Sequence, residues 1–373
     1  MAAAQPNAGG TEETVGSTST IRIGAEAASV TPVACPGVNG TDVDGTGVGS
    51  SAEPRSDSEQ HDTRSTHAVD RRYDLNGSVG ALRRGRGDPA YQVAPDGAIW
   101  LGCRTPANEP GTLRLVRTSP ETVEAQTWGP GARWLQDSVP HLLGLHDTDE
   151  SRAEFADLVE THANPALVKA LRANPGFRVI RSGRVFDSLV PSVLEQRVTV
   201  AGARQSWRRL MRKYGEPAPG PDAMPANAVP AGAISAAVMP TGLLCTPPHR
   251  GWSVIPSWEW RRAEVDGKRS TAILAAARVA SRLEETVGME REEAARRVRT
   301  VPGIGVWTAA EVMHRAHGDA DAVSVGDLHL PRVVCSALGG GVAAGRGADD
   351  EKMLALLEPY RGHRYRVAAL LYR

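Results

Sequence analysis

A glycine-containing turn near the C-terminus is the first feature that could do chemistry. The string VPGIG at residues 301–305 separates two stretches with helical periodicity, 290–300 and 306–317. Two glycines spaced by one apolar residue allow a tight turn whose backbone N–H groups point outward, beside the positive end of the following helix. Such a turn can hold a phosphate. An ordinary glycine turn between packed helices would contain the same two residues, so both interpretations remain open.

A carboxylate follows the turn. Asp327 stands 20 residues after Trp307 (327 − 307), and an apolar stretch runs on from it to Leu338. A fixed carboxylate can stabilise a developing positive charge and can orient an attacking water. Aspartate is also a common N-cap of a helix. The two roles are compatible.

The longer string VPGIGVWTA at residues 301–309 is far more specific than its glycines. It resembles the helix-hairpin-helix motif of the base-excision DNA glycosylase superfamily, in which the hairpin grips the DNA backbone without reading sequence and an aspartate at the position of Asp327 is catalytic. The resemblance implies that the hairpin residues contact the DNA backbone, namely Pro302, Gly303, Ile304, Gly305 and Thr308. An alkali cation held there by backbone oxygens would leave no side-chain signature.

Other segments resemble the bacterial 3-methyladenine DNA glycosylase II type. YDL at 73–75 and VGAL at 79–82 are similar to the opening of that family's β domain, LEQRVT at 194–199 to its DNA-inserting loop, and EPYR at 358–361 to its C-terminal Pro-aromatic-Arg element. The resemblance covers about residues 71–373.

The loop similar to the DNA-inserting segment contains Gln196 and Arg197. A base must leave the stack before it can be excised, and a protein side chain fills the gap. Arg197 is the candidate for this plug. The family commonly has an apolar wedge there, but a flat guanidinium can also stack on bases. A solvated loop arginine is the alternative.

The resemblance implies a base pocket formed by Trp307, Glu311, Tyr360 and Ala81. An alkylated purine is cationic and favours an aromatic face by roughly 0.5–2 kcal/mol, which Trp307 offers unless it only packs in the core. Glu311 and Ala81 stand where aromatic residues are usual, and Tyr360 stands where Trp is usual. We therefore expect a wider, more polar pocket. Glu311 either favours a cationic base, contacts an exocyclic amine of the base, faces solvent or pairs with Arg315 four residues on.

The elements that position these residues form an α+β protein in three parts. Residues 1–68 contain no Trp, Tyr or Phe and show no sustained period, which predicts a disordered, acidic tail. Residues 69–148 contain short β-rich runs between turn signals, which predicts a small antiparallel β domain. Residues 149–373 are predicted to be the helical glycosylase domain, with two subdomains around the active-site cleft.

Apolar spacing predicts the helices near the motifs. One helix ends near residue 194, and the next begins after Thr199 as N-cap. Further helices are expected at about 270–287, 290–300 and 306–317. The Pro-rich stretch 216–250 is predicted to be a long loop, without a definite path.

Composition narrows the class of protein. The 373 residues contain no apolar run of about 18 residues and do not start with a secretory signal. The cysteines, at 35, 103, 245 and 335, form no CxxC pair, and the ten histidines show no metal-ligand spacing. We therefore expect a monomeric cytoplasmic protein, associated with the nucleoid through DNA, that needs no cofactor and has no metal held by side chains.

The net charge of zero hides an uneven distribution. Residues 1–70 contain 3 arginines and 10 Asp or Glu, whereas the remainder contains 40 Lys or Arg and 33 Asp or Glu. The first part therefore has a charge of −7 and the rest +7. A basic body suits a polyanionic partner such as double-stranded DNA with damaged bases.

Together these observations predict a monofunctional DNA glycosylase that excises alkylated purines by hydrolysis in base-excision repair. The alternatives are a nonenzymatic helix-hairpin-helix DNA-binding protein, a glycosylase for another damaged base, and a glycosylase with strand-cleaving lyase activity. Lyase members of the superfamily have a lysine in the place of Trp307, and this chain has only four lysines.

Overall fold

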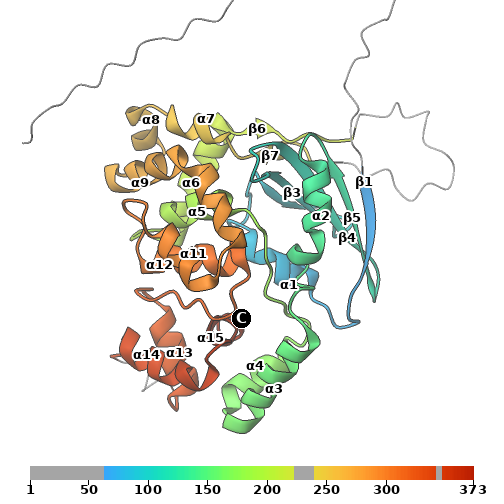
Figure 1. Ribbon diagram of the computed structural model, residues 1–373, viewed down its shortest axis with the longest axis vertical. Coiled ribbons are helices and arrows are strands. Elements are labelled where there is room, and N and C mark those ends of the chain that lie inside the picture. The colour runs from blue at the N-terminus through green and yellow to red at the C-terminus, as the bar shows by residue number, and fades with distance from the viewer. Residues whose placement is uncertain (1–62, 222–238, 342–346) are drawn as a thin grey trace, which may run out of the picture. The chain divides into compact units, whose positions relative to one another are not determined.

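The computed structural model describes residues 63–221, 239–341 and 347–373, which all belong to one compact unit spanning Asp57–Arg373. Its N-terminal part is built on a five-stranded sheet, and the remainder is mostly helical (Figure 1). A mixed fold with a small antiparallel sheet is what the sequence predicts.

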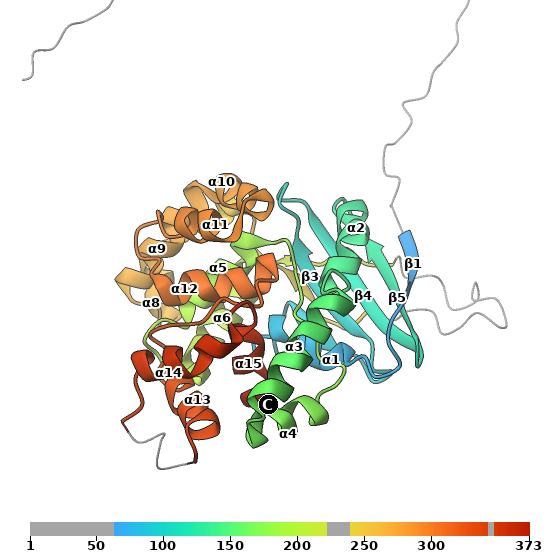
Figure 2. The same ribbon diagram turned by 60° about the horizontal axis from the view of Figure 1, so that its bottom comes forward.

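Every neighbouring pair in the sheet is antiparallel, in the order β1-β5-β4-β3-β2. The strands are β1 (Thr63–Ala68), β2 (Tyr91–Val93), β3 (Ile99–Arg104), β4 (Pro110–Ser119) and β5 (Thr122–Trp128). Leu101 faces Leu113 across β3 and β4, and both belong to a core covered by α2 (Ala132–Leu142). Figures 1 and 2 both show α2 lying across this face of the sheet.

The opposite face of the sheet is covered by part of the Pro-rich stretch. Trp100 and Trp128 stack there with ring centroids 5.3 Å apart. A short ribbon of β6 (Glu216–Pro217) and β7 (Leu244–Cys245) packs beside them. At Gly102 any Cβ would lie 2.4 Å from the carbonyl oxygen of Leu244. The stretch 216–250 is therefore not simply a loop, although 222–238 fall outside the described residues.

The predicted boundary of the N-terminal tail is wrong by six residues. Residues 63–68 form β1, which pairs with β5 along its whole length, whereas 1–62 lie outside the described residues. Apolar patterning missed the strand because polar contacts hold it. The hydroxyls of Thr63 and Thr127 lie 2.6 Å apart, and Gln136 donates a hydrogen bond to Ser65.

Two short helical turns, α1 (Leu75–Val79) and η1 (Gly80–Leu82), connect β1 to β2. The remaining helices, in chain order, are α3 (Asp149–His162), α4 (Pro165–Ala173), α5 (Val185–Leu194), α6 (Val200–Tyr214), α7 (His249–Ser253), α8 (Ser257–Arg262), α9 (Gly267–Arg278), α10 (Ala280–Glu284), η2 (Glu285–Gly288), α11 (Arg291–Val298), α12 (Val306–Val312), η3 (Met313–His317), α13 (Leu330–Leu338), α14 (Asp350–Leu357), η4 (Glu358–Tyr360) and α15 (Arg364–Leu371).

These helices pack into two cores. The larger core is formed by α5 to α12. The smaller one combines α3 and α4 with α13, α14 and α15, which lie far away in the sequence (Figure 2). Two segments separated by more than 150 residues therefore build one helical body, and the chain crosses from the larger core to the smaller one just before Asp327.

The helix boundaries agree with the sequence prediction in part. Thr199 caps α6 and accepts a hydrogen bond from the N–H of Gly202 at 3.2 Å, as expected. The predicted helix at 270–287 is instead broken at Val279, which has φ −118° and ψ 17° and is 41% exposed. A β-branched residue favours helix weakly, and packing does not compensate here. The helix predicted at 306–317 changes to π-helical geometry at Met313.

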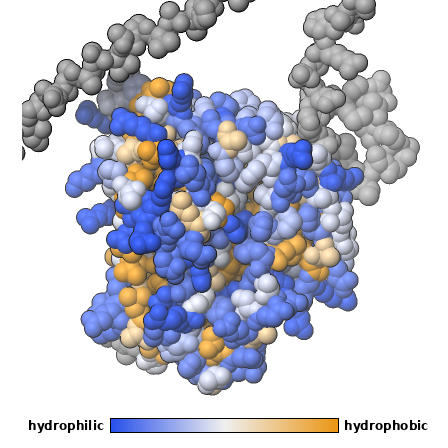
Figure 3. Space-filling model, in the orientation of Figure 1, coloured by the Kyte–Doolittle hydropathy of each residue, from blue (hydrophilic) through white to orange (hydrophobic). Residues whose placement is uncertain are grey.

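None of the helices in the described ranges has both the length and the apolar character that a membrane span requires. On the face drawn in Figure 3, hydrophobic side chains form small patches among hydrophilic ones.

Candidate active site

The glycine turn joins α11 to α12, as the sequence predicts. Ile304 is 6% exposed and packs in the larger helical core, while Pro302, Gly303 and Gly305 are exposed. Gly303 has a φ of 88°, and a Cβ there would lie 2.8 Å from the Cβ of Ala272 in α9. Glycine is therefore required at this position both by the backbone angle and by the close neighbour.

The first turn of α12 presents backbone N–H groups without a capping side chain. Gly305 is the N-cap and has no side-chain oxygen to accept from them. The first N–H groups of a helix have no partner within the helix and carry the positive end of its dipole. This end of α12 is therefore suited to an anion such as a phosphate.

Gln196 connects the loop between α5 and α6 to this turn. Its side-chain amide donates to the carbonyl oxygen of Gly303 at 3.1 Å and to the hydroxyl of Thr308 at 2.7 Å. Thr308 is 2% exposed, so its side chain supports the hairpin from inside. Of the two residues predicted in the DNA-inserting loop, Gln196 is thus engaged with the hairpin.

Arg197 is exposed, and its φ of 53° lies in the left-handed region. A non-glycine residue is strained there, and such strain is concentrated at functional positions. Among the described residues, no hydrogen bond or ion pair involves its guanidinium. The structure therefore holds this side chain outside the fold on a backbone that favours glycine.

Asp327 is held by three N–H donors. Its Oδ1 accepts from the backbone N–H groups of His329 at 2.8 Å and Leu330 at 2.9 Å, and its Oδ2 accepts from the indole Nε1 of Trp307 at 3.1 Å. The carboxylate therefore accepts hydrogen bonds at the start of α13, whose N-cap is His329, and the same bonds fix its orientation. Trp307 and Asp327, predicted from the sequence to act together, are in direct contact.

Glu311 lies one turn after Trp307 and is buried in a polar network. Its Oε1 accepts from the hydroxyl of Ser324 at 2.5 Å and lies 3.3 Å from Nε2 of His314, while its Oε2 pairs with Arg315. Burial alone would raise the pKa of Glu311. Arg315 and the hydrogen bonds from His314 and Ser324 outweigh burial and hold that pKa well below its usual range. Of the roles considered for Glu311, the structure shows the pair with Arg315.

Arg315, in η3, also contacts the sheet-containing part of the chain. Its Nε donates to the carbonyl oxygen of Ala81 at 3.2 Å. Arg84, three residues after Ala81, is buried and lies 3.6 Å from Glu195, the residue before Gln196. Burial, followed by the positive charge of Arg315, lowers the pKa of Arg84. Ala81 thus contributes a backbone carbonyl that fixes an arginine beneath the site.

Tyr360 is placed elsewhere. It is 3% exposed and lies in the smaller helical core, where its ring meets the ring of His162 edge-on at 5.3 Å. Within the described residues no hydrogen bond or aromatic contact joins it to Trp307 or Asp327.

Two other tyrosines, which sequence reasoning missed, face the site from the C-terminal end of the chain. Tyr365 stacks on His314 with ring centroids 4.0 Å apart. Tyr372 is 55% exposed, and its pKa is raised by partial burial and then by the nearby carboxylates of Asp327 and Glu311. The two residues are seven positions apart, about two helical turns, with Tyr365 in α15 and Tyr372 as its C-cap. This spacing was the sequence signal that could have identified the two tyrosines.

Within the part of the chain that the structure describes, no group of three or more His, Cys, Asp or Glu side chains is arranged to hold a metal ion.

Known proteins resemble this chain in both sequence and fold. No family model matches it. Among curated proteins, the AlkA sequences of Mycobacterium tuberculosis strains CDC 1551 / Oshkosh and ATCC 25618 / H37Rv, each described as a probable bifunctional transcriptional activator/DNA repair enzyme, are 28% identical over 229 residues. The match covers 57% of this chain and 42% of each relative, so the chain spans less than half the length of these relatives.

Solved structures share the fold at low sequence identity. A 3-methyladenine DNA glycosylase from Archaeoglobus fulgidus has a TM-score of 0.63 at 16% identity, over 82% of this chain and 97% of that one. An 8-oxoguanine glycosylase/lyase from Clostridium acetobutylicum, in complex with double-stranded DNA, has a TM-score of 0.57 at 10% identity, over 81% and 91%.

The fold is similar to that of these solved DNA glycosylases, and the glycine hairpin of this chain lies beside a fixed aspartate. The sequence similarity to AlkA confirms the resemblance to the 3-methyladenine DNA glycosylase II type.

Proposed function

We propose that the protein is a monofunctional DNA glycosylase that flips alkylated purines out of double-stranded DNA and hydrolyses their N-glycosidic bond. The observation that carries this proposal is the 3.1 Å hydrogen bond between Trp307 and Asp327 at the start of the hairpin helix. It places an aromatic ring and a fixed carboxylate side by side. We expect the protein to act as a monomer on DNA in the cytoplasm.

Binding of the damaged nucleotide is the first step. The exposed hairpin glycines and the uncapped N–H groups of α12 suit a DNA phosphate, and a backbone-bound alkali cation could add to this grip. Arg197 fills the gap that the flipped nucleotide leaves. A cationic base then stacks on Trp307, with Tyr372 as a second exposed aromatic surface near the same carboxylates.

Bond cleavage needs little acid catalysis, because an alkylated purine already carries positive charge. The bond between C1′ and the base nitrogen breaks, and its electron pair leaves with the base, which becomes neutral. The sugar becomes an oxocarbenium-like cation that Asp327 stabilises. Water then adds to C1′ and loses its proton, through Asp327 or directly to solvent. The product is an intact strand with an abasic site.

Base release tests the proposal directly. The full chain is incubated with methylated genomic DNA, and the released bases are identified by mass spectrometry, with Asp327→Asn as the inactive control. We expect release of 3-methyladenine or another alkylated purine by the wild type only. Tight DNA binding without release of any base would instead favour the nonenzymatic DNA-binding protein, and release of uncharged oxidised bases alone would favour a different substrate.

Borohydride trapping tests the monofunctional reaction. A Schiff base with C1′ requires a deprotonated amine, and Trp307 occupies the position of the lyase lysine. Lys268 lies in the first turn of α9, the helix whose Ala272 contacts Gly303. We expect no covalent protein–DNA adduct. An adduct that disappears in Lys268→Ala would overturn the monofunctional assignment.

A further inference from the structure

Five arginines that have no ion-pair partner among the described residues lie on one side of α6 and in the loop beside it. Arg204, Arg208 and Arg212 occur at every fourth position of this helix, and Arg83 and Arg86 belong to the loop that follows η1. We call these five side chains the arginine track. Four of them are exposed and Arg208 is half-buried.

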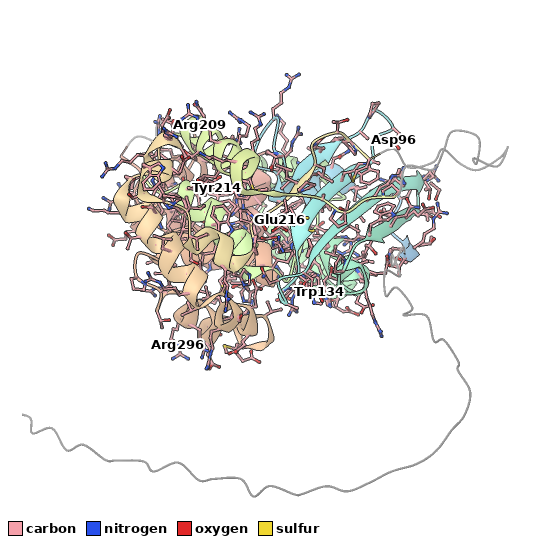
Figure 4. All side chains as sticks on the ribbon, turned by 90° about the horizontal axis from the view of Figure 1, so that it is seen from above. Asp96, Trp134, Arg209, Tyr214, Glu216 and Arg296 are labelled. Atoms are coloured by element: carbon pink, nitrogen blue, oxygen red, sulfur yellow. The ribbon has the colours of Figure 1, made fainter. Side chains whose placement is uncertain are left out.

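The other side of the same helix is neutralised. Arg209 pairs with Glu264 at 2.6 Å, and Lys213 pairs with Glu259 at 2.6 Å. Figure 4 labels Arg209 on this helix. Across the described ranges, no carboxylate lies within ion-pair distance of any arginine of the track, although most buried arginines have one. The uncompensated charge is therefore confined to one face of α6 and the loop beside it.

Two glycines bring the loop onto the helix. Gly85 and Gly87 have φ angles of 83° and 76°, and a Cβ on Gly85 would lie 2.5 Å from Cδ of Arg204. Gly87 lies beside the side chain of Arg208. A hollow of about 420 Å³ has Arg83 and Arg212 in its lining. The loop and the helix thus form one continuous basic surface.

The loop that carries part of the track contacts the elements of the candidate active site. Arg84, within the same loop, lies 3.6 Å from Glu195, which precedes Gln196 and the plug residue Arg197. Ala81, two residues before the track, accepts the hydrogen bond from Arg315 below Trp307. The track therefore begins where the flipped nucleotide would leave the duplex, and it extends along α6.

We propose that the arginine track is a second phosphate-binding surface, which holds the duplex on one side of the flipped nucleotide while the hairpin holds the backbone at the lesion; this inference rests on the proposed function. Residues four apart in a helix are separated by about 6 Å. Alternate phosphates of one DNA strand are separated by about 6.8 Å along the duplex axis. Arg204, Arg208 and Arg212 therefore match a run of phosphates, and guanidinium groups bind phosphate in bidentate geometry.

The salt dependence of DNA binding tests the track. The variant Arg204→Gln with Arg208→Gln is compared with Arg209→Gln with Lys213→Gln, which removes the same charge from the paired side of the same helix. Binding of the full chain to an undamaged duplex and to one with an abasic-site analogue is measured over a range of salt concentrations. We expect the first variant to lower the slope of log K against log salt by about 1.8, and to weaken binding at 0.1 M salt by more than about 10-fold. The second should stay near the wild type.

Trimming the duplex locates the contact. Duplexes with the abasic analogue near one end or near the other are compared, and wild-type binding should fall only when the side facing the track is short. The track variant should bind both equally well. An unchanged salt slope in the track variant, or an equal loss of DNA affinity in the two charge variants, would overturn the proposal that the track binds phosphates. If no damaged base is released but the slopes change as expected, the proposed function fails and the second phosphate surface stands.

Discussion

The indole N–H of Trp307 and the carboxylate of Asp327 are complementary partners, and their 3.1 Å contact affects how Asp327 can be tested. In Asp327→Asn the amide oxygen can still accept from His329 and Leu330. Its NH₂ group then faces the N–H of Trp307, so two donors oppose each other. We expect excision to be abolished, binding to an abasic analogue to change only a few-fold, and stability to fall by about 1 kcal/mol.

Adding Trp307→Phe to this variant removes the opposing donor. The double variant should therefore recover most of the lost melting temperature in calorimetry while remaining inactive in the excision assay. Single Trp307→Phe should keep measurable activity on cationic bases, because a phenyl ring still offers a cation–π face, although a weaker one. Activity in the double variant would show that the carboxylate of Asp327 is not required.

Arg197 has a left-handed backbone, so its function and its contribution to stability should oppose each other. Arg197→Gly should stabilise the free protein by roughly 1 kcal/mol and weaken binding to a duplex with a flippable lesion more than binding to single-stranded DNA. Ala163→Gly is the matched control, since Ala163 has a φ of 44° at the end of α3. The Ala163→Gly protein should be stabilised by a similar amount, without a change in DNA binding. Equal losses on both DNA substrates would make Arg197 an ordinary phosphate contact.

The elements around the hairpin could be predicted because local rules determine them. Helical spacing and a capping threonine define α5 and α6, and the glycine turn is required by a positive φ at Gly303. The aspartate and the tryptophan beside it follow from the same motif. Strand β1 could not be predicted, since backbone pairing and hydroxyl contacts stabilise it without an apolar pattern.

Other features depended on distant packing. The sequence left several roles open for Glu311, and its pair with Arg315 was one of them. The structure favours this pair because Ala81 accepts a hydrogen bond from Arg315 and Ser324 donates one to Glu311. Tyr360 is an aromatic residue in the segment that resembles the C-terminal Pro-aromatic-Arg element, but it packs inside the smaller helical core. Sequence motifs therefore led to the contact between Trp307 and Asp327, whereas the surroundings of Glu311 and Tyr360 depended on tertiary contacts.

Three histidines, of which His314 is buried and His146 and His317 are half-buried, should make the fold sensitive to acid. Burial lowers the pKa of His146, His314 and His317 to about 4. The unfolded chain therefore binds more protons between pH 6.5 and pH 4, and stability is lost as the pH falls through that window. Glu284 opposes this trend, because burial raises its pKa to about 7 and the folded state takes up its proton first.

Melting temperatures measured from pH 7 to pH 4 should show the balance. His146 has both ring nitrogens buried without a partner among the described residues, so His146→Leu should make the decline shallower. Glu284→Gln should make it steeper, since the opposing proton uptake is removed. A stability that rises steadily on acidification would contradict the buried neutral histidines.

Over the whole molecule, charge is divided between an acidic N-terminal segment and a basic body. Residues 1–62 contain 2 arginines and 9 Asp or Glu, a net charge of −7. Their removal should tighten nonspecific DNA binding at low salt and leave the melting temperature nearly unchanged, because their sequence has no apolar pattern for docking. Removal of residues 1–68 also deletes β1, so it should lower the melting temperature by several degrees. Equal melting temperatures for the two truncations would mean that β1 contributes nothing to the sheet.

Gln196 fixes the loop that carries Arg197 relative to the glycine hairpin, because one amide group binds both the carbonyl of Gly303 and the hydroxyl of Thr308. Since the loop and the hairpin are held at a set separation, we expect the DNA to deform when it binds to both. The energy of that deformation depends on the neighbouring base steps, which are pliant at TA and CA and stiff in A-tracts. If the proposed function is right, the same damaged base should therefore be excised faster beside a pliant step than within a stiff one.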